Sequence, residues 1–100
     1  MLCSVFLRRL KPGKSYEDFR KAWEPDVGFG VPTRVINARS LDDPSQIISI
    51  GFVETEASDL PALVERVADS EARRHERIAH VIEATTLRGM FEILDDDDLS

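Results

Sequence analysis

One pair of side chains in the second half of the sequence has the spacing of a proton-transfer site. His75 follows Glu71 by four residues, so on a helix the two side chains lie one above the other on the same face. An imidazole titrates near neutral pH, and a carboxylate one turn away can fix which ring nitrogen carries the proton. The pair therefore predicts His75 as a general acid or base with Glu71 beside it. A structural histidine satisfied by a glutamate at a helix end is the alternative interpretation.

The second histidine does not extend this pair into a metal site. His80 stands five residues beyond His75, which places it about 140° further round a helix of 3.6 residues per turn. The two imidazoles do not converge on such a helix, and we expect no metal centre. The sequence also lacks a nucleophile elbow, a glycine-rich phosphate loop before a helix and a paired-cysteine motif. Covalent hydrolysis and nucleotide-dependent chemistry are therefore disfavoured.

Two further side chains could line a binding site. Trp23 ends an apolar helical stripe, where its ring could form a pocket wall and its indole N–H could orient a ligand. Plain core packing is the alternative for Trp23. Asn37 shares one face of a strand with Arg39 and could orient an anionic or phenolic ligand, or could face solvent at a sheet edge. Ser49 and Gly51 leave volume on one face of another strand, for a ligand or for a partner's side chains.

The elements that must position these residues form two βαβ halves around a hairpin at residues 33–54. Its turn, Asp42-Asp43-Pro44-Ser45, combines residue types that favour chain reversal. Strand-like runs at 35–41 and 46–53 flank the turn. A helical pattern and an outer strand lie beyond each of them.

Local signals set the limits of the helices. Ser15 and Asp18 predict a capping box at the start of the first helix, and Pro25 ends it. The stripe of the second helix continues through Glu71 and His75. Either this helix breaks near Ser70, which could cap a short third helix, or one long helix carries the polar pair toward the sheet. The break is the favoured alternative. In the last strand, Gly89 predicts a bulge or kink.

Two βαβ units with right-handed crossovers predict an α+β fold, the ferredoxin-like βαββαβ sandwich. Its four-stranded antiparallel sheet would have the order 4-1-3-2, with both helices on one face. The first and third strands are central because both of their faces carry apolar residues. A large apolar sheet face is rarely left exposed, so we expect a homodimer that packs sheet to sheet.

Composition limits the partners and the compartment. The 100 residues form one expected domain at 1–94, followed by an acidic tail at 95–100 that should be disordered. The net charge is −6, of which residues 95–98 supply four negative charges. Scattered basic residues disfavour nucleic acid and anionic membranes as partners. A single cysteine, Cys3, and the lack of a long apolar run or a leader pattern favour a cytoplasmic protein.

Two short motifs within this element order resemble a known family. They are Phe19-Arg20-Lys21-Ala22-Trp23 and Arg88-Gly89-Met90-Phe91-Glu92-Ile93. With them the chain resembles the dimeric α/β-barrel superfamily, which includes antibiotic-biosynthesis monooxygenases, haem-degrading monooxygenases and stress-responsive barrel proteins. The resemblance implies a dimeric barrel and a pocket between sheet and helices that, in enzymatic members, holds a small aromatic or polyketide-like substrate, often without metal or cofactor.

The resemblance gives two hypotheses for function. Haem-degrading members have an Asn on the first strand and a His on the second helix; here the first strand offers Ser4, so only His75 could match. One hypothesis is a cofactor-independent monooxygenase with His75 as acid or base and with Trp23, Asn37 and Phe52 as pocket walls. The alternative is a non-catalytic dimer that binds a small ligand or another protein. A cavity with a buried, titrating histidine would favour the first, and a filled interior with His75 in water would favour the second.

Overall fold

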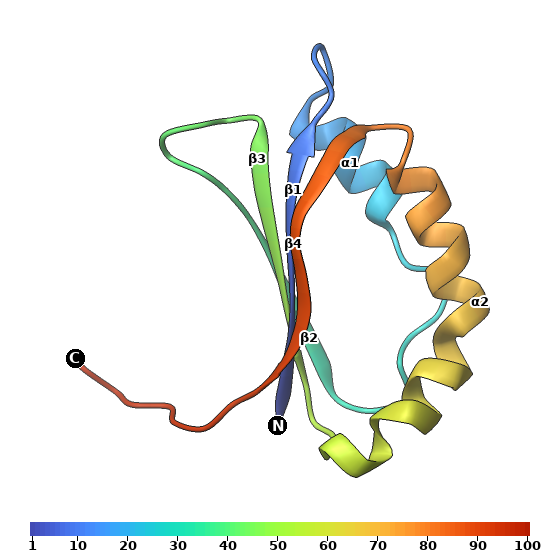
Figure 1. The fold of residues 1–100 in the computed structure, drawn as a ribbon, viewed down its shortest axis with the longest axis vertical. Coiled ribbons are helices and arrows are strands. Elements are labelled where there is room, and N and C mark those ends of the chain that lie inside the picture. The colour runs from blue at the N-terminus through green and yellow to red at the C-terminus, as the bar shows by residue number, and fades with distance from the viewer.

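The computed structural model describes residues 1–100 as one sheet with two helices on one of its faces (Figure 1). The strands are β1 (Leu2–Leu10), β2 (Thr33–Arg39), β3 (Gln46–Val53) and β4 (Ile82–Glu92), and the helices are α1 (Tyr16–Trp23) and α2 (Leu60–Ile78). A short 3₁₀ turn, Ala57–Asp59, precedes α2. All strand pairs are antiparallel, in the order β2-β3-β1-β4. The predicted ferredoxin-like fold and its strand order are confirmed.

The two central strands separate the molecule into a helix side and an open side. In β3 the residues Ile47, Ser49, Gly51 and Val53 are buried, and the residues between them are half-buried. Because side chains alternate along a strand, Ile48, Ile50 and Phe52 point to the other face, which no helix covers (Figure 1). The same two strands therefore form the floor beneath the helices and the middle of an open apolar face.

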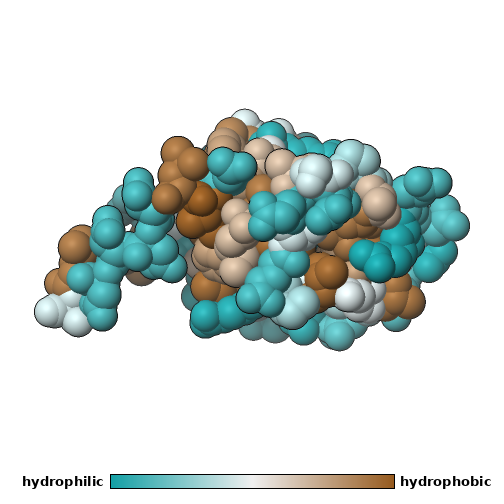
Figure 2. All heavy atoms as spheres, turned by 90° about the horizontal axis from the view of Figure 1, so that it is seen from below, coloured by the Kyte–Doolittle hydropathy of each residue, from teal (hydrophilic) through white to brown (hydrophobic).

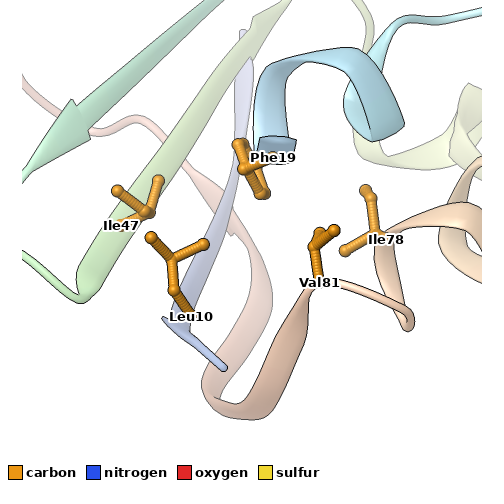
Figure 3. Packing of buried hydrophobic residues seen from close by; sticks show 5 residues of the cluster. All are labelled: Leu10, Phe19, Ile47, Ile78 and Val81. Carbon is orange, nitrogen blue, oxygen red and sulfur yellow. The ribbon is translucent and has the colours of Figure 1, made fainter. Parts of the chain in front are cut away.

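The hydrophobic core lies at one end of the sheet, under α1 and the last turn of α2. Phe19, Ile47 and Ile78 are the largest fully buried side chains. Leu10 and Val81 complete the cluster, which brings together one residue from each of β1, β3 and the two helices and one from the loop before β4 (Figure 3). The core anchors the C-terminal end of α2 to the sheet.

Short polar contacts fix the ends of these elements. At the start of α1 the Asp18 backbone N–H donates to Ser15 Oγ (3.2 Å) and the Ser15 N–H donates to Asp18 Oδ2 (2.9 Å), which confirms the predicted capping box. At the tip of the hairpin the Ser45 N–H donates to Asp43 Oδ1 (3.1 Å). Arg9 Nη1 donates to Asp43 Oδ2 (2.9 Å), and this contact ties the tip to β1.

The predicted break near Ser70 is wrong, because α2 runs without interruption over 19 residues. Ser70 is buried at 6% exposure in the face of α2 that packs toward the sheet. The polar residues that interrupt the apolar stripe are accommodated within the helix, since Arg74 donates to the Glu71 carboxylate one turn earlier. The segment after Pro61 contains neither Gly nor Pro, so nothing in it opposes helix propagation.

The predicted bulge at Gly89 is also wrong in position. Gly89 pairs with Val5 in regular register, whereas Leu7 pairs with Leu87 and Arg8 with Thr85, which leaves Thr86 as an additional residue. A second shift, between Arg9 and Leu10, leaves Glu83 as another. The Thr86 hydroxyl donates to the Leu7 carbonyl at 3.2 Å. Glycine at 89 has a packing reason instead, since a Cβ there would lie 3.1 Å from ring carbons of Phe91.

No helix or strand follows Glu92, and the chain ends in an exposed acidic segment. Figure 2 shows this segment as a largely hydrophilic extension, with hydrophobic surface next to it on the body of the molecule. Neither helix is both long enough and apolar enough to cross a membrane.

Candidate functional site

A cavity of about 730 Å³ lies between α2 and the helix side of the sheet. Part of its floor consists of Ser4 of β1 and of Ser49 and Gly51 of β3. Their side chains are short or absent and therefore leave volume above the sheet. Towards the start of α2 the walls are apolar. This apolar end consists of Val35, Val53, Leu60, Leu63, Val64, Val67 and Met90. The volume predicted at Ser49 and Gly51 therefore faces the helices of the same chain.

His75 projects from α2 into the wall of the cavity. Its ring meets Phe6 edge to face, with 5.7 Å between the centroids. The Nε2 atom is buried and has no hydrogen-bond partner. Burial lowers the pKa of His75 below its usual 6.5, and the charges of Arg74, Arg88 and Arg8 act in the same direction, while Glu71 opposes them. The ring is therefore neutral at pH 7, and its free nitrogen can accept a proton.

Glu71 lies beside His75, but its carboxylate is committed to another residue. Arg74 Nη2 donates to Glu71 Oε2, whereas His75 Nε2 lies 3.7 Å from the same oxygen, beyond hydrogen-bond distance. Glu71 therefore neutralises one arginine and does not hold the imidazole by a hydrogen bond.

Three arginines, here called the arginine cluster, line the end of the cavity opposite its apolar end: Arg8, Arg74 and Arg88. Arg8 is 3% exposed and its guanidinium lies 4.3 Å from the Phe6 centroid. The Arg88 guanidinium lies 5.3 Å from the same centroid. Burial lowers the pKa of Arg8 to about 10, and Arg74 and Arg88 lower it too. The cluster therefore concentrates positive charge at one end of the cavity.

A chain of hydrogen bonds across three strands holds Arg8 in place. Arg8 Nη1 donates to Ser49 Oγ (3.2 Å), and that hydroxyl donates to Asn37 Oδ1 (2.6 Å). Asn37 and Ser49 face each other across β2 and β3. Asn37 thus lies behind the cavity wall and contacts it through Ser49.

Trp23 lines the cavity from the end of α1. The Arg74 guanidinium lies 5.1 Å from its ring centroid, and Arg20 lies 5.0 Å from the ring as well. Such contacts stabilise a guanidinium that has lost part of its hydration. Trp23, Glu71 and His75 are therefore brought together around Arg74.

Phe52 does not belong to this group. It pairs with Cys3 and Arg34, and the alternation of β3 directs its side chain to the open side of the sheet. Phe52 takes no part in the wall of the cavity, since the helix-side positions next to it are Gly51 and Val53.

The loop between α1 and β2 closes another side of the cavity with Phe29. Asp26 in this loop forms ion pairs with Arg73 (3.0 Å) and Arg77 (3.5 Å) of α2. Arg77 also donates to the backbone carbonyls of Ala22 and Glu24. These contacts hold the loop and the end of α1 against α2.

Sequence reasoning missed the arginine cluster, although a signal for part of it exists. Arg74 stands seven residues after Val67 and four before Ile78, which places it on the buried stripe of α2. Arg8 lies an even number of residues from Leu2 and Leu10 on a central strand, and therefore on the same face of that strand. No cluster of three or more His, Cys, Asp or Glu side chains that could hold a metal ion is present.

A solved structure shares this fold over nearly its full length. It is a protein of Chloroflexus aurantiacus J-10-fl described as a "putative antibiotic biosynthesis monooxygenase", with a TM-score of 0.66, 14% sequence identity, and coverage of 99% of this chain and 98% of that one. At this identity the similarity shows the fold alone, and the resemblance to that family is confirmed at the level of the fold. No protein-family model matches the sequence. No curated protein matches it either.

Proposed function

We propose that the protein is a small homodimer whose cavity binds an aromatic, polyketide-like molecule and oxygenates it without a cofactor. The observation that carries this proposal is the Nε2 atom of His75, which is buried, without a hydrogen-bond partner, in the wall of a cavity. A cavity lined by a half-buried imidazole with a lowered pKa is the arrangement expected of a general base.

The dimensions of the cavity agree with a ligand of several fused rings. Its volume of about 730 Å³ falls within the range of roughly 300–1,000 Å³ that is usual for small-molecule sites. One end is apolar, and the other end carries His75, Glu71 and the arginine cluster. A flat aromatic molecule could therefore lie along α2 with its most acidic group near His75.

The proposed reaction converts an activated CH₂ group into a ketone. His75 Nε2 takes one C–H proton, and the electron pair stays on the substrate as a carbanion that the arginine cluster stabilises. The carbanion transfers its electrons to dioxygen and forms a C–O bond, and the resulting peroxide recovers the proton from His75. Loss of the second C–H proton then breaks the O–O bond, and the products are the ketone and one water.

An apolar surface on the open side supports the homodimer. Ile36, Leu87 and Phe91 are 40%, 46% and 48% exposed on that side. Ile36 pairs with Ile50 of β3, and Leu87 and Phe91 pair with Leu7 and Cys3 of β1. Contiguous apolar surface of this kind usually marks an interaction site. Sheet-to-sheet pairing would cover it and leave the cavity, on the opposite face, accessible.

Oxygen uptake with anthrone as the probe substrate tests the proposal. We expect consumption of one dioxygen per anthrone, with formation of the corresponding quinone. His75→Gln should lower kcat by at least about 100-fold, the usual contribution of a positioned acid or base, while anthrone binding persists. His80→Gln is the matched control, because His80 lies in the turn after α2 and does not line the cavity. An unchanged kcat in His75→Gln would disprove the role of His75.

The second candidate is a non-catalytic dimer that binds a small ligand or a protein. The Glu71 carboxylate accepts a hydrogen bond from Arg74, so no group lies within hydrogen-bond distance of His75 Nε2 to receive a proton from it. This observation favours the non-catalytic candidate. Saturable binding of anthrone without oxygen uptake would support this candidate.

A further inference from the structure

The end of the cavity that holds the arginine cluster carries an excess of positive charge. Arg8, Arg74 and Arg88 face a single carboxylate, Glu71, among the residues that line the cavity, and His75 is neutral there. Two of the arginines are almost fully buried, with 3% exposure for Arg8 and 6% for Arg74. Buried like charges repel each other at short range, so this arrangement is unfavourable unless an anion joins it.

The hydrogen-bonding capacity of the cluster is mostly unused. Arg8 donates one side-chain hydrogen bond, to Ser49, and Arg74 donates one, to Glu71. Arg88 forms no hydrogen bond or ion pair, although it lies within 5.3 Å of the Phe6 centroid beside Arg8. Arg74 Nε is buried and has no partner. A guanidinium carries five N–H donors, and a buried donor without a partner is destabilising.

Phe6 and Trp23 lie beside the guanidinium groups of the three arginines, all of which line the same cavity. Arg8 and Arg88 both stack on Phe6, and Arg74 lies over Trp23. Planar guanidinium groups match the two oxygens of a carboxylate or the single oxygen of a phenolate. The rings of Phe6 and Trp23 offer flat apolar contact directly beside that position.

We infer that the occupant of the cavity is an anion, an apolar ring system that carries one acidic oxygen group and seats that group against Arg8, Arg74 and Arg88. The inference rests on the proposed function, since it takes the cavity as a small-molecule site and names the class of molecule. The acidic group is a carboxylate or an ionised phenol or enol. The rings extend from it towards the apolar end of the cavity, along Val67 and Leu63.

Two ligands of similar shape, one charged and one neutral, test this inference. 2-Naphthoate and 2-naphthamide share one ring system, and their affinities are measured by calorimetry and by the fluorescence of Trp23, the single tryptophan. We expect 2-naphthoate to bind at least about tenfold more tightly, the effect of one charge-assisted hydrogen bond. Added salt should weaken 2-naphthoate binding more than 2-naphthamide binding.

The variant Arg88→Gln assigns the effect to the cluster. Arg88 lies on the edge strand β4 and is exposed, so its replacement leaves the fold intact. We expect about a tenfold loss of 2-naphthoate affinity and no change for 2-naphthamide. Lys21→Gln is the matched control, because it removes the same charge from α1 outside the cavity, and it should change neither affinity.

A coloured phenol distinguishes the two kinds of acidic group. The phenolate of 4-nitro-1-naphthol absorbs in the visible range, so its fraction at a fixed pH reports the acidity of the bound phenol. A rise in the phenolate fraction on binding, reduced in Arg88→Gln, assigns an ionised phenol or enol. Preference for 2-naphthoate without such a rise assigns a carboxylate.

The outcomes separate this inference from the proposed function. If 2-naphthamide binds as tightly as 2-naphthoate, the cavity is a small-molecule site but the inference that its occupant is an anion is wrong. If neither naphthalene binds, the small-molecule site itself is wrong and the inference fails with it.

Discussion

His75 Nε2 lies 3.7 Å from Glu71 Oε2, and that oxygen accepts a hydrogen bond from Arg74 instead. The helical spacing that brings His75 and Glu71 together also brings Arg74 to the same carboxylate, one residue closer along α2. The arginine is the stronger partner because it is charged at every relevant pH. The Nε2 atom of His75 is therefore left without a hydrogen-bond partner.

The stability of the protein should depend on the ionisation of His75. Its pKa in the folded state is lowered from 6.5 by burial, so the unfolded chain binds more protons between the two pKa values. The contribution of His75 is then fully present above pH 6.5 and is lost as the pH falls through the folded pKa. We expect the free energy of unfolding in urea to decrease from pH 7.5 to pH 5, and to decrease less in His75→Gln.

The same titration can be observed directly by NMR from the imidazole Hε1 of His75. The charges that act on it are Glu71 and Arg74 of α2, Arg8 of β1 and Arg88 of β4. Arg88→Gln should raise the pKa of His75, because it removes a positive neighbour. A variant with an equal or lower pKa would contradict this placement of Arg88.

The core cluster should tolerate truncation far less than the wall of the cavity. Ile78 is 1% exposed and Val64 is 52% exposed on the same helix. Ile78→Ala should lower the free energy of unfolding by about 2–5 kcal/mol, whereas Val64→Ala should change it by less than about 0.5 kcal/mol. Urea denaturation followed by circular dichroism measures both. Equal losses would mean that α2 is not anchored at its C-terminal end.

A charge on the open side should prevent dimer formation without unfolding the chain. Ile50 lies near the middle of β3 and points away from the helices, so Ile50→Glu would bury a carboxylate in the proposed interface. We expect a monomer by sedimentation velocity where the unmodified protein sediments as a dimer. Val27→Glu is the control, because Val27 is 55% exposed in the loop before β2. A monomeric unmodified protein at micromolar concentration would disprove the sheet-to-sheet pairing.

A larger residue at Gly51 should exclude ligands from the floor of the cavity. A Cβ at this position would lie 2.7 Å from Ser4 Oγ and 3.7 Å from Val35 Cγ2. Gly51→Ala requires only a rotation of the Ser4 hydroxyl and should retain binding. Gly51→Val adds two methyl groups that occupy ligand volume, and its affinity for 2-naphthamide should fall at least about tenfold. Equal affinity in both variants would place the ligand elsewhere.

The local signals in the sequence were sufficient for the architecture. The capping box at Ser15 and the apolar central strands depend on neighbouring residues or on strand parity, which a sequence displays directly. The predicted position of the bulge is wrong because a glycine usually marks one, whereas here Gly89 accommodates Phe91 and the additional residues are Thr86 and Glu83. The break at Ser70 failed because a buried serine within a helix resembles a cap in sequence.

The charged half of the site could not be predicted in the same way. Arginine is rarely buried, and the buried Arg8 is held by hydrogen bonds that involve two other strands. Ser49, which accepts from Arg8, lies 41 positions away in the sequence, and Asn37, which accepts from Ser49, lies 12 positions from Ser49. The side of β3 that faces the helices was equally undetermined, because Ile48, Ile50 and Phe52 are as apolar as the residues between them. Phe52 was therefore assigned to the pocket although it belongs to the open side.

Because side chains alternate along β1 and β3, the cavity and the open face are formed by the same two strands. Arg8 and Ser49 reach the cavity from strands whose intervening residues, Leu7, Ile48 and Ile50, form the open face. A second subunit seated on that face and a ligand in the cavity would therefore act on the same backbone. Their free energies would be linked reciprocally, so ligand affinity would vary with the total protein concentration.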